Sequence, residues 1–81
     1  MSNIRKFIPK VEAAIKRIDP EIIVQRTFYD EVSDRLYVGI VKGLHETDIV
    51  LLGHEFEDEL LKSVNRSLEQ GIKKLEQMPI S

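Results

Sequence analysis

The chain has no cysteine, only four glycines and no long apolar run among its 81 residues. Without cysteine it cannot form disulfide bonds, thiolate zinc sites or cysteine-ligated iron–sulfur clusters. No apolar stretch approaches the roughly 18 residues that a membrane-spanning helix needs, and no signal-peptide pattern precedes the first helix-like segment. We therefore expect a cytoplasmic protein with neither a membrane anchor nor a disulfide framework.

Catalytic motifs are also missing. No serine or threonine stands in a nucleophile elbow or a triad motif, and the glycines form no phosphate-binding loop. We therefore name no catalytic residue and no cofactor, and the sequence favours a non-catalytic protein. The net charge of −2, from 12 basic and 14 acidic residues, is not typical of a nucleic-acid-binding protein either.

The length indicates one small domain over residues 1–81. The composition, 42% apolar and 32% charged, is that of a folded protein. Residues 1–8 are predicted to form either a flexible arm or a kinked helical turn, because Pro9 disfavours a regular helix before it. Residues 79–81 are predicted to form a tail.

Two segments have the periodicity of an amphipathic helix. Apolar side chains recur every three or four residues over residues 9–18, and Asp19 and Pro20 end this pattern. A second apolar stripe predicts a helix over residues 54–77. Glu57 falls in the middle of this stripe, where a carboxylate could act as an acid or a base but more commonly lies at the rim of a core.

Two segments between the helices have the composition of β-strands. Residues 21–29 and 35–42 are rich in β-branched and aromatic side chains, and a polar turn separates them. A symmetric hairpin would pair residues whose numbers sum to 64, with Phe28 on the core face. The opposite face would be half apolar and would carry Ile23, Tyr29, Tyr37 and Val41.

A third strand is predicted at residues 49–52, a short apolar run that follows a turn over residues 43–48. The same run could instead open the last helix, because so short a stretch has no distinguishing period. The resulting order, α-β-β-β-α, predicts an α+β domain in which both helices pack on one face of an antiparallel sheet.

This order, over residues 9–77, resembles the topology of the double-stranded-RNA-binding domain. The resemblance implies that lysines at the start of the last helix would bind phosphates across the major groove. The corresponding positions here are acidic: Glu55, Glu57, Asp58 and Glu59. Because these charges would repel phosphate, they argue against the family's function. An alternative is single-stranded RNA on the second sheet face, where Tyr29, Tyr37 and Arg35 could stack on bases.

Both histidines lie in an acidic stretch, residues 45–58. A metal-binding or hydrolytic site in this stretch would use His45, His54, Glu57 and Asp58. Imidazole and carboxylate groups suit zinc, and the string that begins with His54 starts like the HExxH helix of metalloproteases. However, aspartate replaces the second histidine of that motif. The simpler interpretation is a solvated acidic cap on the last helix.

The last helix and the sheet together carry more apolar surface than so short a chain is expected to cover alone. A twofold homodimer would bury both with one self-complementary surface, whereas a monomer would have to cover them with Lys and Arg side chains. The predicted interface comprises Ile23, Tyr29, Tyr37, Val41, Leu61, Leu68, Ile72 and Leu75. The sequence therefore favours a small interaction or regulatory module that self-associates.

Overall fold

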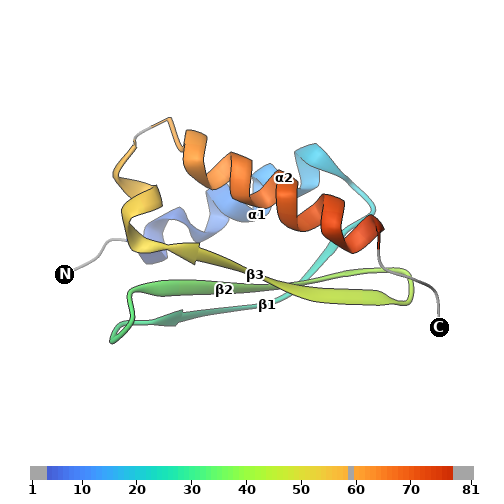
Figure 1. The fold of residues 1–81 in the computed structure, drawn as a ribbon, viewed down its shortest axis with the longest axis horizontal. Coiled ribbons are helices and arrows are strands. Elements are labelled where there is room, and N and C mark those ends of the chain that lie inside the picture. Colours follow the sequence, from blue (N-terminus) through green and yellow to red (C-terminus); the bar gives the residue numbers. More distant parts are fainter. Residues whose placement is uncertain (1–3, 59, 78–81) are drawn as a thin grey trace.

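Two helices lie side by side on one face of an antiparallel sheet, and no described helix covers the other face (Figure 1). The computed structural model describes residues 4–58 and 60–77. Their elements are the 3-10 helix η1 (Ile4–Phe7), α1 (Ile8–Ile18), β1 (Ile23–Asp30), β2 (Arg35–Lys42), β3 (His45–Leu52), the 3-10 helix η2 (Gly53–Glu57) and α2 (Lys62–Glu76). The prediction of an α+β fold in the order α-β-β-β-α is confirmed.

The sheet has the strand order β1-β2-β3, and both strand pairs are antiparallel. The hairpin of β1 and β2 begins in the predicted register, with Ile23 opposite Val41. The register then shifts by one residue between Val24 and Arg26. Gln25 is the extra residue of this β-bulge, which the symmetric hairpin did not anticipate.

The bulge exchanges the two faces of β1 beyond it. Phe28 lies opposite Tyr37, and Tyr29 lies opposite Leu36. A one-residue shift moves every following side chain to the other face of the sheet. Phe28 therefore belongs to the outer face and Tyr29 to the inner face, which is the reverse of the prediction.

The strand β3 is longer than predicted, because it begins at His45 instead of Ile49. The turn before it consists of Gly43 and Leu44, and Gly43 adopts a positive φ of 63° that glycine accommodates without strain. Residues 45–48, predicted as a turn, therefore pair with β2.

The predicted helix over residues 54–77 is instead two helices, η2 and α2. The carboxylate of Asp58 separates them, because it accepts hydrogen bonds from the backbone N–H of Leu60, at 3.0 Å, and of Lys62, at 3.3 Å. Such local bonds compete with continuation of a helix. Leu61 then redirects the chain with a positive φ of 53°.

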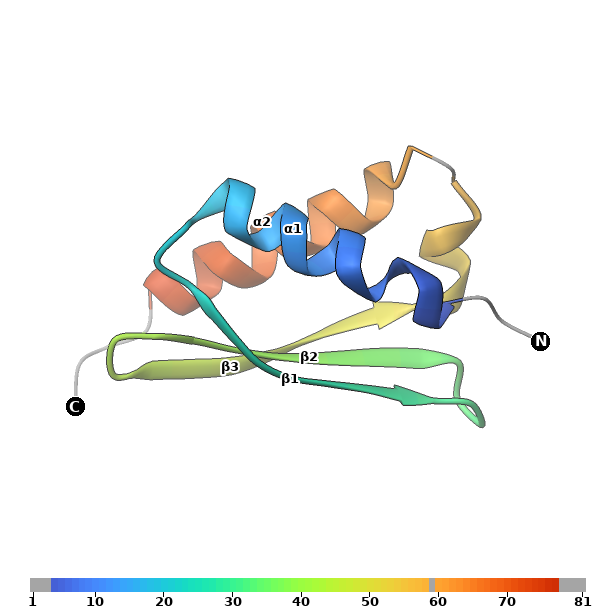
Figure 2. The same ribbon diagram turned by 180° about the vertical axis from the view of Figure 1, so that it is seen from behind.

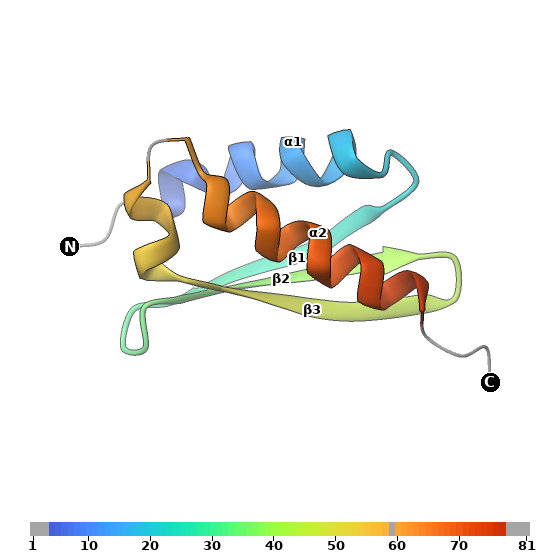
Figure 3. The same ribbon diagram turned by 45° about the horizontal axis from the view of Figure 1, so that its top comes forward.

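The core fills the space between the sheet and the helices. Its buried apolar side chains come from both layers: Ile4, Val11, Ile15, Ile22, Leu36, Val38, Ile40, Ile49, Leu51, Phe56, Val64, Leu68, Ile72 and Leu75. The helix α2 crosses over β3 (Figure 3). Gly71 permits this close approach, because a Cβ there would lie 2.6 Å from Cγ1 of Ile49.

The N-terminal segment packs onto the same core (Figure 2). Ile4 is buried, and the ring of Phe7 lies 5.5 Å from that of Phe56. Residues 4–7 form the 3-10 helix η1, which leads directly into α1. Residues 1–3 and the predicted tail at 79–81 lie outside the described residues. Within the described part of the chain, each helix is too short or too polar to traverse a bilayer.

A candidate interaction surface on the outer sheet face

The helical half of the predicted interface belongs to the core of the chain itself. Leu68, Ile72 and Leu75 are buried between α2 and the sheet, and Leu61 is half-buried against the same core. The expectation that α2 offers a free apolar stripe is therefore wrong. The stripe is covered because α2 packs on β3 and against α1.

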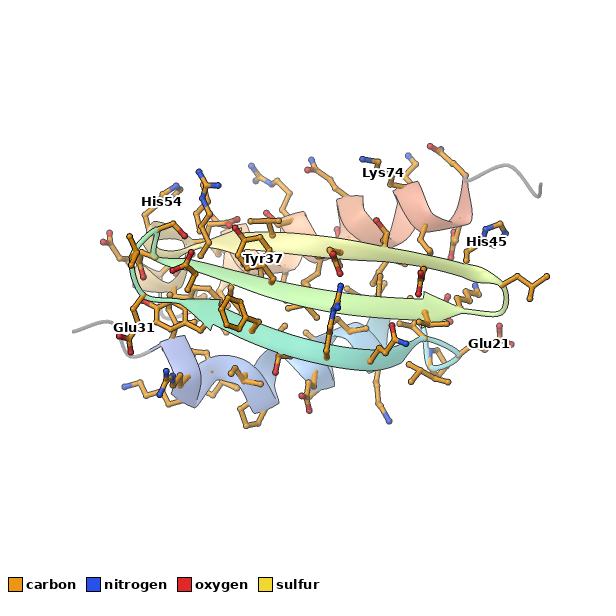
Figure 4. All side chains as sticks on the ribbon, turned by 90° about the horizontal axis from the view of Figure 1, so that it is seen from below. Glu21, Glu31, Tyr37, His45, His54 and Lys74 are labelled. Atoms are coloured by element: carbon orange, nitrogen blue, oxygen red, sulfur yellow. The ribbon has the colours of Figure 1, made fainter. Side chains whose placement is uncertain are left out.

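The sheet half of the predicted interface behaves differently. Ile23 lies on the outer face with 64% of its surface exposed, and Tyr37 and Val41 are half-buried on that face. Figure 4 shows this face toward the viewer, with Tyr37 near its centre. Tyr29 is an exception, because the bulge turns it inward, where its hydroxyl donates a hydrogen bond of 2.5 Å to Oδ1 of Asp34.

An apolar row crosses the outer face from strand to strand. Phe28 on β1 pairs with Tyr37 on β2, which pairs with Val50 on β3. The rings of Phe28 and Tyr37 lie 6.2 Å apart, and Phe28 and Val50 are 62% and 42% exposed. Leu52 continues the apolar surface along β3 and is 37% exposed. Antiparallel sheets with one solvated face usually carry polar side chains there, so this row makes the outer face a candidate interaction surface.

A charged row lies directly beside the apolar one. Arg26 on β1 and Asp48 on β3 are both in register with Gly39 on the central strand. The side chains meet above Gly39, with Nη2 of Arg26 3.5 Å from Oδ2 of Asp48. A Cβ at Gly39 would lie 3.0 Å from Cγ of Arg26 and 3.1 Å from Oδ1 of Asp48, so glycine leaves the space that this ion pair occupies.

The sequence could not identify Phe28, Val50 and Leu52 as part of this surface. Phe28 was expected in the core because the bulge at Gln25 leaves no clear signal in the sequence. Val50 and Leu52 alternate with Ile49 and Leu51 in a run that is apolar on both faces, so the sequence does not tell which of the two faces the helices cover. The alternation of Thr47, Ile49 and Leu51 on the inner side would have been the available signal.

The predicted metal ligands do not come together. His45 stands at the first residue of β3 and His54 follows its last residue, so the two imidazoles lie at opposite ends of the sheet (Figure 4). Among residues 4–58 and 60–77, no group of three or more His, Asp or Glu side chains is placed to hold a metal ion. Asp58 instead bonds the backbone at the start of α2, and Glu57 is exposed. The described structure therefore does not bring the four predicted ligands into one site.

The buried carboxylate of this region is Glu55, which is 8% exposed. Its Oε2 accepts a hydrogen bond of 2.7 Å from the backbone N–H of Leu52, and its Oε1 accepts one of 2.5 Å from Oγ of Ser67. Glu55 thus joins the end of β3 to the middle of α2. Glu57 was predicted to lie in the apolar stripe because one continuous helix was assumed. In the separate helix η2, it is Glu55 that points inward.

The break before α2 also changes the comparison with the double-stranded-RNA-binding domain. Glu55 and Glu57 belong to η2, and Asp58 lies in the connection, so these acids precede α2. The first turn of α2, which begins at Lys62, contains no acidic residue. The acidic first turn that the resemblance argument relied on is therefore not present in the structure.

A second polar cluster ties both helices to the opposite end of the sheet. Nζ of Lys42 lies 2.6 Å from Oδ2 of Asp19, beyond α1, and 3.4 Å from Oε1 of Glu76, at the end of α2. The hydrogen bond from Lys42, together with one from the backbone N–H of Glu21, lowers the pKa of Asp19 below its ordinary value. The same hydrogen bond to Asp19 raises the pKa of Lys42. We interpret these contacts as structural, because the ion pairs of Lys42 connect the end of the sheet to the ends of both helices.

No family model, curated protein or solved structure matches this chain significantly. The candidate surface therefore rests on the geometry of the outer sheet face.

Proposed function

We propose that this protein is a non-catalytic interaction module that self-associates through its outer sheet face. The observation that carries the proposal is the exposed row of Phe28, Tyr37 and Val50 across the three strands. Aromatic residues are enriched in protein interfaces, and an uncovered apolar sheet face is a common place for a partner to dock. We also propose a cytoplasmic location, which a chain without cysteine suits.

A second copy is the partner that the charge of this face fits. Its basic residues, Arg26 and Arg35, are nearly balanced by its acidic ones, Asp30, Glu46 and Asp48. A nearly neutral face does not repel its own copy, and a twofold axis lets one surface serve both subunits. The single-stranded RNA alternative is weakened as well. Asp48 forms an ion pair with Arg26, and Tyr29 lies on the inner face of the sheet instead of the outer one.

The size of the face sets the strength of the association. Strands of eight residues, spaced about 4.8 Å apart, make a face of roughly 14 Å by 26 Å. This is smaller than the area of about 800 Å² that each partner contributes to a standard interface. We therefore expect a weak, concentration-dependent dimer with a Kd in the micromolar range or above, on the order of −8 kcal/mol or weaker.

Analytical ultracentrifugation of the wild type and of Phe28→Asp tests the proposal. The wild type should approach twice its subunit mass of 9.4 kDa as concentration rises. Phe28→Asp should weaken the association by about tenfold or more, because it places a charge in the apolar row. The matched control is Val32→Asp, which adds the same charge at an exposed apolar residue in the β1–β2 turn, away from the face. A wild type that remains at 9.4 kDa at millimolar concentration would refute self-association.

A further inference from the structure

In the middle of the outer face, the two edge strands carry charges of opposite sign. In the central row, the β1 position is basic, Arg26, and the β3 position is acidic, Asp48. Glu46 adds a second acidic residue on β3. Between them, Gly39 on β2 contributes no side chain and no charge. One edge of the face is therefore positive at its middle and the other edge is negative.

Two symmetric arrangements are open to a pair of such faces that meet with their strands aligned. A twofold axis that runs across the strands places β1 over β1 of the partner, so that Arg26 meets Arg26 of the partner subunit. A twofold axis that runs along β2 places β1 over β3 of the partner. Like charges in contact disfavour the first arrangement, and opposite charges favour the second.

We infer that two copies pair about an axis along β2, with Arg26 of each subunit facing Asp48 of the partner subunit. This inference rests on the proposed self-association and specifies its geometry. The ion pair that each chain already forms across Gly39, at 3.5 Å, becomes one half of a closed ring of two arginines and two aspartates. The four charges alternate around this ring.

The neighbouring row fits the same arrangement. Phe28 lies over Val50 of the partner subunit on both sides of the axis, and Tyr37 lies on the axis against its own copy. The missing side chain at Gly39 leaves room for the Arg26 and Asp48 side chains in the middle of the face, where the charged ring forms. Arg35, at the end of β2, also faces its own copy in this arrangement, and Asp30, which lies opposite Arg35 on β1, brings a negative charge to the same end of the face.

Cross-linking of single-cysteine variants tests the geometry, because the natural chain contains no cysteine. We choose Arg26→Cys and Asp48→Cys in the central row, where the twist between packed sheets displaces facing residues least. A short bismaleimide suits the test, because packed sheets lie about 10 Å apart. Intact-mass spectrometry distinguishes the three cross-linked products of an equal mixture. Gln70→Cys, on the exposed side of α2, supplies the background rate.

The inferred geometry predicts that the mixed product, Arg26→Cys joined to Asp48→Cys, forms about tenfold faster than either self-joined product. A faster self-joined product of Arg26→Cys would overturn the geometry in favour of the axis across the strands. A faster self-joined product of Asp48→Cys would also overturn it, in favour of pairing between the β3 edges. In both cases self-association itself would stand. Rates no higher than the Gln70→Cys background, with a monomeric wild type, would refute the proposed function as well.

A charge exchange gives an equilibrium measurement that does not depend on the reagent. Arg26→Asp alone and Asp48→Arg alone should each lose self-association, because each places like charges across the interface. An equal mixture of the two variants should regain it, because every contact in the mixed pair joins opposite charges. If both single variants associate as strongly as the wild type, the charged row does not lie in the interface and the inference is wrong.

Discussion

The two faces of the sheet are built from adjacent residues of the same strands, yet one face is buried and the other is exposed to solvent. On β3, Leu51 is completely buried on the inner face, whereas its neighbour Leu52 is 37% exposed on the outer face. Both faces carry apolar side chains, and they differ because α1 and α2 cover the inner one (Figure 1). Among the described helices and strands, most of the large apolar side chains that remain exposed therefore lie on the outer face of the sheet. The apolar side chains of the helices lie mainly in the core.

The largest expected effect compares these two leucines directly. Leu51→Ala should lower the free energy of unfolding by about 2–5 kcal/mol, because it leaves a cavity in the packed core. Leu52→Ala removes the same atoms from a partly exposed position and should cost less than about 1 kcal/mol. Urea unfolding at low micromolar concentration, where the monomer dominates, measures both. Equal losses in the two variants would mean that the faces are not distinct.

A smaller effect concerns how the helical layer is fastened over the inner face. Glu55→Ala removes the acceptor for the backbone N–H of Leu52 and for the hydroxyl of Ser67. Leaving these donors unsatisfied should cost about 1–3 kcal/mol. The control is Glu57→Ala, an exposed carboxylate on the same short helix, which should change stability by less than about 0.5 kcal/mol. Thermal unfolding that ranks Glu57→Ala as the more damaging variant would contradict the assignment of Glu55 as the fastening residue.

The smallest effect concerns the opposite end of the layer and depends on pH. Because the pKa of Asp19 is lowered in the folded protein, its contribution to stability is present above its ordinary pKa and is lost as the pH falls through the lowered value. The pKa of Lys42 is raised, so its contribution is present below its ordinary pKa and is lost at strongly alkaline pH. Lys42→Met should therefore lower the Tm at pH 7.

The difference in Tm between wild type and Lys42→Met should shrink as the pH falls below the ordinary pKa of an aspartate, about 4, and through the lowered pKa of Asp19. Lys74→Met, an exposed lysine of α2, serves as the control and should leave the acid limb of the Tm profile unchanged. A constant difference between pH 2 and pH 7, roughly the range over which carboxylates titrate, would show that the Lys42–Asp19 contact does not act through this titration.

The order of helices and strands was predictable from the sequence, because the helical period of the first helix and the strand composition of the hairpin correspond to elements of the structure. The alternation of side chains along the hairpin also predicted that Ile23, Tyr37 and Val41 lie on the outer face, where the structure places them. Two local features that leave no periodic signal in the sequence account for differences between the predicted and the observed elements. The bulge at Gln25 exchanged Phe28 with Tyr29, and the side-chain bonds of Asp58 divided the last helix. Each depends on the local backbone conformation of one or two residues, which hydrophobic periodicity does not reveal.

The difference between the two sheet faces also explains why only part of the predicted interface is exposed. Leu68, Ile72 and Leu75 were correctly identified as one apolar stripe, but periodicity alone does not tell whether a stripe faces its own core or a partner. In this chain the inner face of the sheet is broad enough to cover the stripe. The outer face, which no described helix covers, is the surface that we propose for association.

A concentration series of two-dimensional amide NMR spectra tests the central claim most directly, because it reports on both faces at once. Between about 20 µM and about 1 mM, a range that spans a weak Kd, amide shifts at Arg26, Phe28, Tyr37 and Val50 should change together along one binding curve. The amides of Gln70 and Lys74 on α2 should remain constant. Shifts that change only on the helices, or on no residue at all, would contradict an outer sheet face that binds a second copy.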